Sequence, residues 1–374
     1  MLNGREQTNA SNLFEWRELL VKILQVCHRY YPYIGGLETH VKEISERLFR
    51  SGFEIEVLTT DPSGMLPREE VINGLKIRRF KSWAPNEAYY FSESLRKYLK
   101  KCADKYDIVH AHGYHALPAL YASQAKMQNK LVFTPHYHGK GHTLIRNALH
   151  IPYKFLARKI FENADKIVCV SNYEKMLILR NFRVKEEKVA IIPNGVNFEE
   201  FEKLEKRGKN HRIILCVSRL EKYKGIDFLI KVMPKLETDI HLEIVGKGPH
   251  EKNLKKLANR LRVAERVTFY KDLPREKLLM KYANADLFAL LSRHEAYGIS
   301  VAEALCAGTP CIVANTSALT EWIDDVNCFG IGYPINLDEL AGLITRMIGK
   351  EVKRPRLYNW DEITEMLAKL YSSI

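Results

Sequence analysis

Short apolar runs alternate with longer amphipathic segments along most of the chain. In the first half, these apolar runs predict strands near residues 21–27, 54–59, 107–111, 130–134, 167–170 and 189–192. Between the first two, Glu38–Arg50 carries apolar residues at helical spacing, and we expect an amphipathic helix there. Strands that alternate with helices predict an α/β domain built on a parallel sheet.

The pattern breaks at residues 196–211, a charged segment that we interpret as a linker without a strand. A second series of apolar runs then predicts strands near residues 212–217, 240–245, 266–270, 287–291 and 310–313. We therefore expect two Rossmann-like, doubly wound domains with a central cleft. Clefts of this kind are preferred ligand sites.

Composition narrows the class of protein only slightly. The 374 residues include 58 Lys and Arg against 45 Asp and Glu, which gives a net charge of +13. That charge suits an anionic small molecule, an anionic membrane surface or nucleic acid, and it also suits the charged surface of a thermophile. The seven cysteines are scattered without a CxxC pair, so we expect buried free thiols in a reducing cytoplasm.

Two further features bear on localisation. No apolar run approaches the ~20 residues that a membrane-spanning helix needs. Residues 1–20 are polar and lack the apolar core of a signal peptide, so we interpret them as a flexible tail. We expect a cytoplasmic protein.

Gly35 and Gly36 stand in the segment HRYYPYIGGLETHVKEI, between an apolar strand and a helix that starts near Leu37. Adjacent glycines let the backbone approach a ligand, and a helix N-terminus offers free N–H groups and a partial positive charge. This arrangement predicts a site for a phosphate or for a sugar attached to one, although a plain turn is an alternative. No GxGxxG or Walker A sequence occurs in the chain.

Arg219 and Lys224 follow the first predicted strand of the second half, at its carboxyl end. In an open α/β sheet this end faces the crevice, where an arginine can bind phosphate oxygens bidentately and a lysine adds a compact charge. Ordinary surface cations are the alternative. Gly246 and Gly248 follow the next strand and would admit a flat ring or a ribose, although a tight strand–helix turn explains them almost as well.

Histidines gather in VHAHGYH, residues 109–115, and in TPHYHGKGH, residues 134–142. The spacing lacks the HExxH form and no cysteine accompanies it, so we expect no metal. We expect one histidine at a strand end to face the cleft. His136 is our choice, because a strand terminus holds an imidazole against a reacting sugar better than the glycine-rich loop that follows.

Two glutamates eight residues apart, Glu295 and Glu303, lie in SRHEAYGISVAEALCAGTPCIVA. One interpretation is a capping box, in which Ser300 caps a helix and Glu303 only bonds backbone N–H. In the other, the helix starts at Gly298, and N–H groups that include those of Ile299 and Ser300 bind a diphosphate. Glu303 would then accept ribose hydroxyls, and Glu295 would hold the hydroxyls of a sugar.

These segments together resemble the retaining glycosyltransferases of family 4, which have the GT-B fold. The resemblance covers about residues 21–374, and its most specific part is E-x7-E, here Glu295 to Glu303. GGLETHV, IPNGVNFEEF, SRLEKYKG and VGKGP accompany it in the order of the family. One departure is Thr316-Ser317-Ala318, where the family often carries Gly-Gly before a final Glu, here Glu321.

The resemblance implies roles for individual residues. Gly35 and Gly36 match the glycine loop near the donor, Arg219 and Lys224 match the diphosphate-binding cations, and His136 matches a histidine near the sugar. Glu303 matches the ribose ligand, and Glu295 the donor-sugar ligand. The C-terminal helix of this fold crosses back to the first domain. The expected domains are therefore residues 21–195 plus 356–374 for the acceptor, and 212–355 for the donor.

We accordingly expect an enzyme that moves a hexose from a nucleotide-diphosphate sugar to an acceptor hydroxyl, with retention and with neither metal nor cofactor. The acceptor would be a sugar, a lipid-linked molecule or a small molecule. A sugar-nucleotide epimerase on the same fold and a non-catalytic nucleotide-binding protein remain alternatives. We expect no nucleic acid partner, since no aromatic-basic repeat is present. Residues 145–161 could form a basic amphipathic helix on an anionic membrane, at the inner face, or pack on their own domain.

Overall fold

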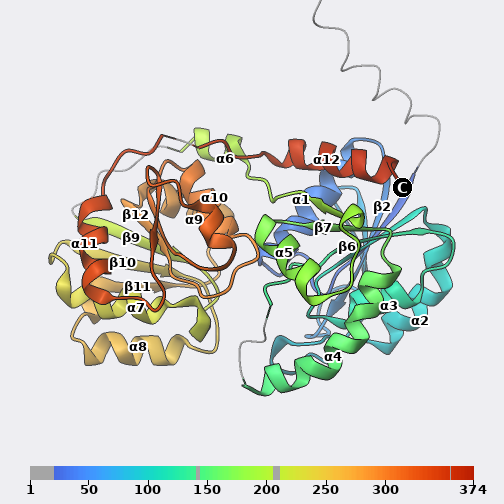
Figure 1. The fold of residues 1–374 in the computed structure, drawn as a ribbon, viewed down its shortest axis with the longest axis horizontal. Helices are drawn as coiled ribbons and strands as arrows, with labels where there is room; N and C mark the ends of the chain where they lie inside the picture. The colour runs from blue at the N-terminus through green and yellow to red at the C-terminus, as the bar shows by residue number, and fades with distance from the viewer. Residues whose placement is uncertain (1–20, 140–143, 205–210, 354) are drawn as a thin grey trace, which may run out of the picture.

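The computed structural model describes residues 21–139, 144–204, 211–353 and 355–374, and it leaves out the side chains of residue 86 and of residues 144–152. The expected N-terminal tail, residues 1–20, lies outside this description. The chain forms two α/β domains side by side, each with helices on both faces of a central sheet (Figure 1).

The N-terminal domain has a sheet in the order β3-β4-β2-β1-β5-β6-β7-β8, parallel except where β3 pairs with β4. Its strands are β1 Lys22–Val26, β2 Glu54–Asp61, β3 Glu69–Ile72, β4 Leu75–Lys81, β5 Ile108–His112, β6 Lys130–Thr134, β7 Lys166–Cys169 and β8 Val189–Ile191. Its helices are α1 Gly36–Arg50, α2 Glu93–Cys102, α3 Leu117–Gln124, α4 Leu144–Asn163 and α5 Asn172–Asn181. The hairpin β3–β4 was not predicted, because its edge position leaves charged side chains between the apolar ones.

The C-terminal domain has a parallel sheet in the order β11-β10-β9-β12-β13-β14. Its strands are β9 Arg212–Val217, β10 Ile240–Val245, β11 Val267–Tyr270, β12 Leu287–Leu290, β13 Cys311–Ala314 and β14 Cys328–Ile331. Its helices are α7 Ile226–Val232, α8 Glu251–Arg260, α9 Arg275–Asn284, α10 Ile299–Cys306 and α11 Leu337–Met347. Only β14 was missed, because its four residues include a glycine and half of them are only partly buried.

The segment expected to be a plain linker contains a short helix, α6 Phe198–Glu202. Phe201 is buried in the core of the C-terminal domain, so this part of the segment belongs to that domain. One buried aromatic ring thus attaches this otherwise charged stretch to the core of the C-terminal domain. Residues 205–210 of the same segment lie outside the described part.

The last helix, α12 Trp360–Ser372, packs on α1 of the N-terminal domain (Figure 1). Asn359 caps it, with Glu362 completing a capping box. Trp360 and Leu370 are buried in one apolar cluster with residues of β1 and α1, where the resemblance had placed them. The chain therefore returns to its first domain after completing its second.

Each sheet reverses its strand order once, between β1 and β5 in the N-terminal domain and between β9 and β12 in the C-terminal domain. Loops that follow neighbouring strands on opposite sides of such a switch point diverge and leave a crevice. Contacts described below join these loops across the interface of the two domains. The topology thus fixes where a ligand site can form.

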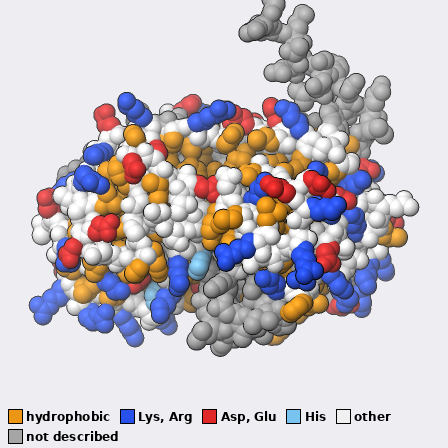
Figure 2. Space-filling model, in the orientation of Figure 1, with side chains coloured by type: hydrophobic (Ala, Val, Ile, Leu, Met, Phe, Trp, Pro, Cys, Tyr) orange, Lys and Arg blue, Asp and Glu red, His pale blue; other side chains and the backbone are white. Residues whose placement is uncertain are grey.

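Three further observations concern charge, cysteines and membrane-spanning helices. On the face shown in Figure 2, Lys and Arg side chains are spread over both domains instead of forming one patch. All seven cysteines are free and buried, as expected. Among the described residues, no helix has the length and apolar character to cross a membrane.

Candidate active site

Lys224 and Glu295 meet at the switch point of the C-terminal sheet. Lys224 follows β9, Glu295 follows β12, and Lys224 Nζ lies 2.5 Å from Glu295 Oε1. Burial would lower the pKa of Lys224, but the Glu295 carboxylate outweighs it, and the net effect raises the pKa. The structure therefore joins the residue expected to bind diphosphate and the residue expected to bind the sugar in a single ion pair.

Helix α10 begins at Ile299, with Gly298 as its N-cap and no side-chain cap. Gly298 has a left-handed φ of 98°, which favours glycine, and a Cβ there would lie 3.1 Å from Leu319. Ser300 lies inside the first turn, so the capping-box interpretation is wrong. The N–H of Val301 binds the Gly298 carbonyl, whereas the first N–H groups of a helix have no partner within it. Ile299 and Ser300 are thus the helical positions with donors for an anion.

Glu303 lies one turn into α10 and is 8% exposed. Arg275, at the start of α9, contacts its carboxylate and also donates to Glu200 of α6 at 2.7 Å. Burial would lower the pKa of Arg275, but Glu303 and Glu200 together raise it. A carboxylate has about four lone-pair positions, so the ion pair orients Glu303 without exhausting it. No sequence motif includes Arg275, so its contact with Glu303 could not be predicted.

The two glycines after β10 lie close to backbone of the same domain. A Cβ on Gly246 would lie 2.0 Å from the carbonyl oxygen of Ser218, and one on Gly248 would lie 2.5 Å from that of Leu220. Gly246 also has a φ of 145°. These close approaches hold the loop that carries Arg219, which fits the tight-turn alternative and accounts for both glycines without a ligand.

The Thr316-Ser317-Ala318 segment supports the loop of Glu295. The hydroxyl of Ser317 accepts a hydrogen bond from the Glu295 N–H at 3.0 Å. Glu321 reaches into the N-terminal domain, where it accepts from the N–H of Tyr173 at 2.7 Å and of Asn172 at 3.2 Å. Glu321 therefore caps α5 across the domain interface, a role that the sequence did not predict.

The glycine loop of the N-terminal domain faces α10. A Cβ on Gly36 would lie 3.6 Å from Cδ1 of Ile299, so these two predicted donor-binding positions are brought together. A Cβ on Gly35 would lie 2.3 Å from Oε2 of Glu38. Glu38 is buried and accepts from Arg29 Nε at 2.8 Å, which restricts its movement. Gly35 thus makes room for this acid.

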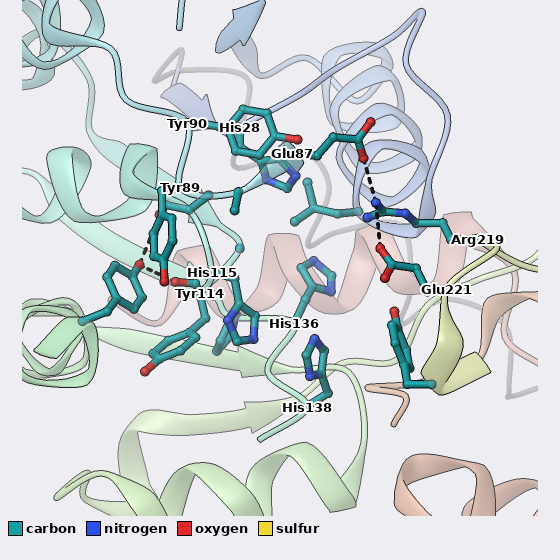
Figure 3. A pocket seen from close by; sticks show the side chains of 17 residues that line it. His28, Glu87, Tyr89, Tyr90, Tyr114, His115, His136, His138, Arg219 and Glu221 are labelled. Carbon is teal, nitrogen blue, oxygen red and sulfur yellow. Dashed lines mark hydrogen bonds and ion pairs between the residues drawn. The ribbon is translucent and has the colours of Figure 1, made fainter. Parts of the chain in front are cut away.

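A cavity of about 220 Å³ opens between the domains. From the N-terminal domain it is lined by residues after β1, β5 and β6, among them the predicted His136, and from the C-terminal domain by the loop of Arg219. Figure 3 shows the rings of His115, His136 and His138 directed into it, with tyrosines on one side. Lys224, Glu295, Gly298 and Glu303 are not among its lining residues, so the predicted site extends beyond this cavity.

Arg219 already contacts two carboxylates. It is 45% exposed in its side chain and lies 2.7 Å from Glu87 of the N-terminal domain and 3.3 Å from Glu221, as the dashed lines in Figure 3 show. Glu87 also lies 3.5 Å from Arg29. Both carboxylates contact the same nitrogen, Nη2, so a diphosphate that approaches Arg219 would meet the negative charge of Glu87.

His136 also faces inward, toward two buried histidines. One ring nitrogen of each of His40, His112 and His136, which we call the histidine triad, lies within 4.8 Å of those of the other two. Sequence spacing did not suggest this group, because the three residues come from α1, β5 and the turn after β6. We expected no metal at the histidines, and the arrangement of these three is compatible with an ion.

Burial keeps the histidine triad neutral. Loss of solvation lowers the pKa of His40 to about 4 and lowers the pKa of His112 and His136 well below the ordinary value, with the neighbouring rings adding to the effect for the latter two. Neutral imidazole is the form that acts as a hydrogen-bond acceptor or a metal ligand. His28, which lines the same cavity, behaves alike: burial lowers its pKa to about 4.

Comparison with known proteins agrees with this geometry. Residues 34–200 match the family described as Glycosyltransferase Family 4, and residues 197–360 match Glycosyl transferases group 1. An uncharacterized glycosyltransferase of Methanocaldococcus jannaschii is 29% identical, over 94% of this chain and 98% of that protein. The phosphatidylinositol N-acetylglucosaminyltransferase GPI3 subunit of Saccharomyces cerevisiae is 23% identical, over 94% of this chain and 83% of that protein.

A solved structure shares the arrangement of the two domains. HepE of Anabaena, in complex with UDP and glucose, superposes with a TM-score of 0.76 at 18% identity, over 95% of this chain and all of that one. The two family matches adjoin and together extend from residue 34 to residue 360. The chain therefore belongs to the glycosyltransferases, with a family 4 N-terminal domain and a group 1 C-terminal domain in the GT-B fold.

Proposed function

We propose that the enzyme transfers a hexose from a nucleotide-diphosphate sugar to an acceptor hydroxyl, with retention of the anomeric configuration. The observation that carries the proposal is the Lys224–Glu295 ion pair at the switch point of the C-terminal sheet, in the same loop as the start of α10. Gly36 faces that helix start from the other domain. The complex of HepE with UDP and glucose supports a nucleotide donor of this class.

Different polar groups would bind the diphosphate, the ribose and the hexose of the donor. The first N–H groups of α10, at Ile299 and Ser300, and the ammonium of Lys224 would bind the diphosphate. Arg219 would join them once Glu87 has moved. Farther into the helix, Glu303 would accept hydrogen bonds from ribose hydroxyls, while Glu295 would hold hydroxyls of the hexose.

In the proposed reaction, the bond between the anomeric carbon and the diphosphate oxygen breaks while the acceptor oxygen bonds to that carbon on the same face. The acceptor proton passes to the leaving phosphate oxygen. Charge then grows on the diphosphate, and Lys224 with the α10 dipole would stabilise it, because fixed cations and dipoles in a dry cleft act without reorganisation. No side chain of the described site is assigned as a covalent nucleophile.

The proposal needs no metal at the diphosphate and no cofactor. Among the described residues, one group has the geometry to hold an ion, the histidine triad, and all three of its residues belong to the N-terminal domain. Transfer should therefore continue in excess EDTA, without stimulation by Mg²⁺ or Mn²⁺. Loss of transfer that Mn²⁺ or Mg²⁺ restores would overturn this part of the proposal.

The acceptor would enter through the cavity lined by histidines and tyrosines, whose flat rings suit a sugar or another small hydroxyl compound. A lipid-linked acceptor is favoured by one surface. On α4, Phe155 and Leu156 are 67% and 49% exposed and lie beside the exposed Lys159. Apolar and basic side chains together suit the headgroup region of an anionic membrane. The first part of this predicted segment lies outside the described side chains.

Vesicle sedimentation tests the membrane role. Anionic vesicles should recover more of the enzyme than neutral vesicles, and Phe155→Ser should reduce the difference. Equal recovery with both kinds of vesicle would leave α4 as a helix that serves only its own domain.

Labelled UDP-, GDP- and ADP-hexoses test the central proposal and its alternatives. A donor that binds the folded enzyme should raise the melting temperature, and transfer to an acceptor should give a product with the anomeric configuration of the donor, as measured by NMR. An epimerase would instead convert the donor alone into an isomer. A binding protein would be stabilised by nucleotide without turnover. Tight, strongly salt-dependent binding of nucleic acid, without stabilisation by any nucleotide sugar, would favour a nucleic-acid-binding protein instead.

A further inference from the structure

The histidine triad combines parts of the N-terminal domain that are distant in sequence. His40 lies in the first turns of α1, His112 ends β5, and His136 follows β6. His40 and His112 are 2% and 0% exposed. One nitrogen of each ring, His40 Nε2, His112 Nδ1 and His136 Nε2, is buried and has no hydrogen-bond partner. Three such groups in one place are unusual, because buried polar atoms are nearly always paired.

Two of the rings are held so that the unpaired nitrogen carries a lone pair. His40 Nδ1 lies 2.7 Å from the amide oxygen of Asn194, and His112 Nε2 lies 2.7 Å from that of Gln25. An amide oxygen can only accept, so both of these ring nitrogens carry the proton. The opposite nitrogens are therefore acceptors without a donor. Histidines that bind metals usually donate their other N–H to an oxygen in this way.

We propose that the histidine triad binds one divalent transition-metal ion of the zinc class. With ligand nitrogens no more than 4.8 Å apart, a point exists within about 2.8 Å (4.8/√3) of all three. Zn–N bonds are about 2.0–2.1 Å long, so each nitrogen would have to move inward by roughly 0.7 Å. Rotation of the side chains can supply a movement of this size.

The backbone of His136 gives independent support. Its φ of 49° lies in the left-handed region, which costs free energy in a residue other than glycine and which clusters at functional sites. This conformation directs the ring both to the cavity and to the triad. A metal on Nε2 would fix the proton on Nδ1 and make His136 a hydrogen-bond donor of constant orientation.

The donor set indicates which ion fits. Three neutral imidazoles favour zinc, copper or nickel over Mg²⁺ and Mn²⁺. Within the described ranges, no carboxylate or thiolate joins the three histidines, so a water molecule would complete the coordination. The site also adjoins the donor half of the enzyme: the carbonyl of Asn194 accepts from the Tyr297 hydroxyl at 2.9 Å, immediately before Gly298.

Cobalt titration tests the proposal on the full chain. After EDTA treatment and dialysis, the protein should bind one equivalent of Co²⁺ with visible d–d absorption, and Zn²⁺ should displace it. His40→Gln and His112→Gln should abolish this absorption. His138→Gln, which removes another histidine of the same cavity outside the triad, should leave it unchanged, with folding checked by circular dichroism.

Gln25→Leu keeps the test decisive if the histidine variants fail to fold. It removes the acceptor that orients His112 and should weaken Co²⁺ binding by about 10- to 100-fold. Absence of the absorption in the wild type would overturn the proposal and leave water or a shared proton among the rings. Equal binding by all variants would overturn it as well and would indicate surface histidines. If removal of metal abolishes transfer and only Zn²⁺ restores it, the result supports a metal at the histidine triad. If Mn²⁺ restores transfer, the result indicates a metal at the diphosphate instead.

Discussion

Buried polar groups are treated differently on the two sides of the cleft, which we call the C-terminal wall (Lys224, Arg275, Glu295 and Glu303) and the N-terminal wall (the histidine triad). On the C-terminal wall each cation has its acid: Lys224 pairs with Glu295, and Arg275 with Glu303. On the N-terminal wall, the histidine triad offers neutral acceptors with nothing to accept from. The C-terminal residues must therefore give up an ion pair to bind a ligand, whereas the histidines of the N-terminal domain would gain a partner. Both walls are arranged before any ligand arrives.

Loss of the Lys224–Glu295 ion pair in the C-terminal wall should have the largest effect on stability and transfer. Lys224→Met leaves the Glu295 carboxylate largely buried without its partner, which should cost about 3 kcal/mol of unfolding free energy. Transfer should fall by roughly 10²- to 10³-fold, because the developing charge on the diphosphate loses a fixed cation. Denaturant unfolding and a transfer assay measure the two losses. Lys222→Met, two positions earlier and exposed, is the matched control, and equal behaviour of the two variants would show that Lys224 is an ordinary surface lysine.

The two glutamates of the same wall should fail differently. Glu303→Gln should weaken binding of nucleoside diphosphate and of intact donor alike, by about 1.5–3 kcal/mol, because both ligands contain the ribose. Glu295→Gln should leave binding of nucleoside diphosphate within a few-fold, because it frees Lys224, and should mainly lower transfer. Calorimetric titration followed by a transfer assay separates these outcomes. Two variants close to wild type would contradict the assignment of both residues.

Acid should lower the free energy of unfolding through the histidines of the N-terminal wall. Because the folded-state pKa of His40 is about 4, against an ordinary 6.5, the unfolded chain takes up this proton first. Stability should therefore be complete above about pH 6.5 and fall as the pH drops toward 4. Replacing His40 by Gln should flatten the decline by on the order of 1–3 kcal/mol. Melting temperatures measured across this range test it, with His250→Gln of the C-terminal domain as control. A parallel decline in the His40 variant would place the titrating groups elsewhere.

Loss of the Glu87–Arg219 ion pair between the two domains should have the smallest effect on binding and stability. Glu87→Gln removes the acid that occupies Arg219, so nucleoside diphosphate should bind a few-fold more tightly. Stability should change by less than about 1 kcal/mol, because both side chains are about half exposed. Binding curves of this variant and of Glu93→Gln, an exposed acid on α2, give the comparison. Weaker binding in the Glu87 variant would mean that the acid helps to hold the ligand.

The sequence predicted the two-domain fold well, because most of the buried parallel strands are short and mainly apolar and alternate with amphipathic helices. It could not predict β3 and β4, whose edge position leaves them partly polar, or α6, which Phe201 anchors in a charged segment. In the site, motifs located Lys224, Glu295 and Glu303 but not their pairing. The sequence could not predict the contacts of Arg275 or the histidine triad, because the residues that meet there are far apart in sequence and are brought together only by the fold.

The return of α12 has a consequence for the order of synthesis. The N-terminal domain buries Trp360 in its core, yet the ribosome makes that residue only after the whole C-terminal domain. At about 5–20 residues per second, the first domain waits roughly ten to thirty seconds for its last helix. During that interval the apolar surface that α12 will cover is available to chaperones. The N-terminal domain can therefore complete its core only after the C-terminal domain has been synthesised.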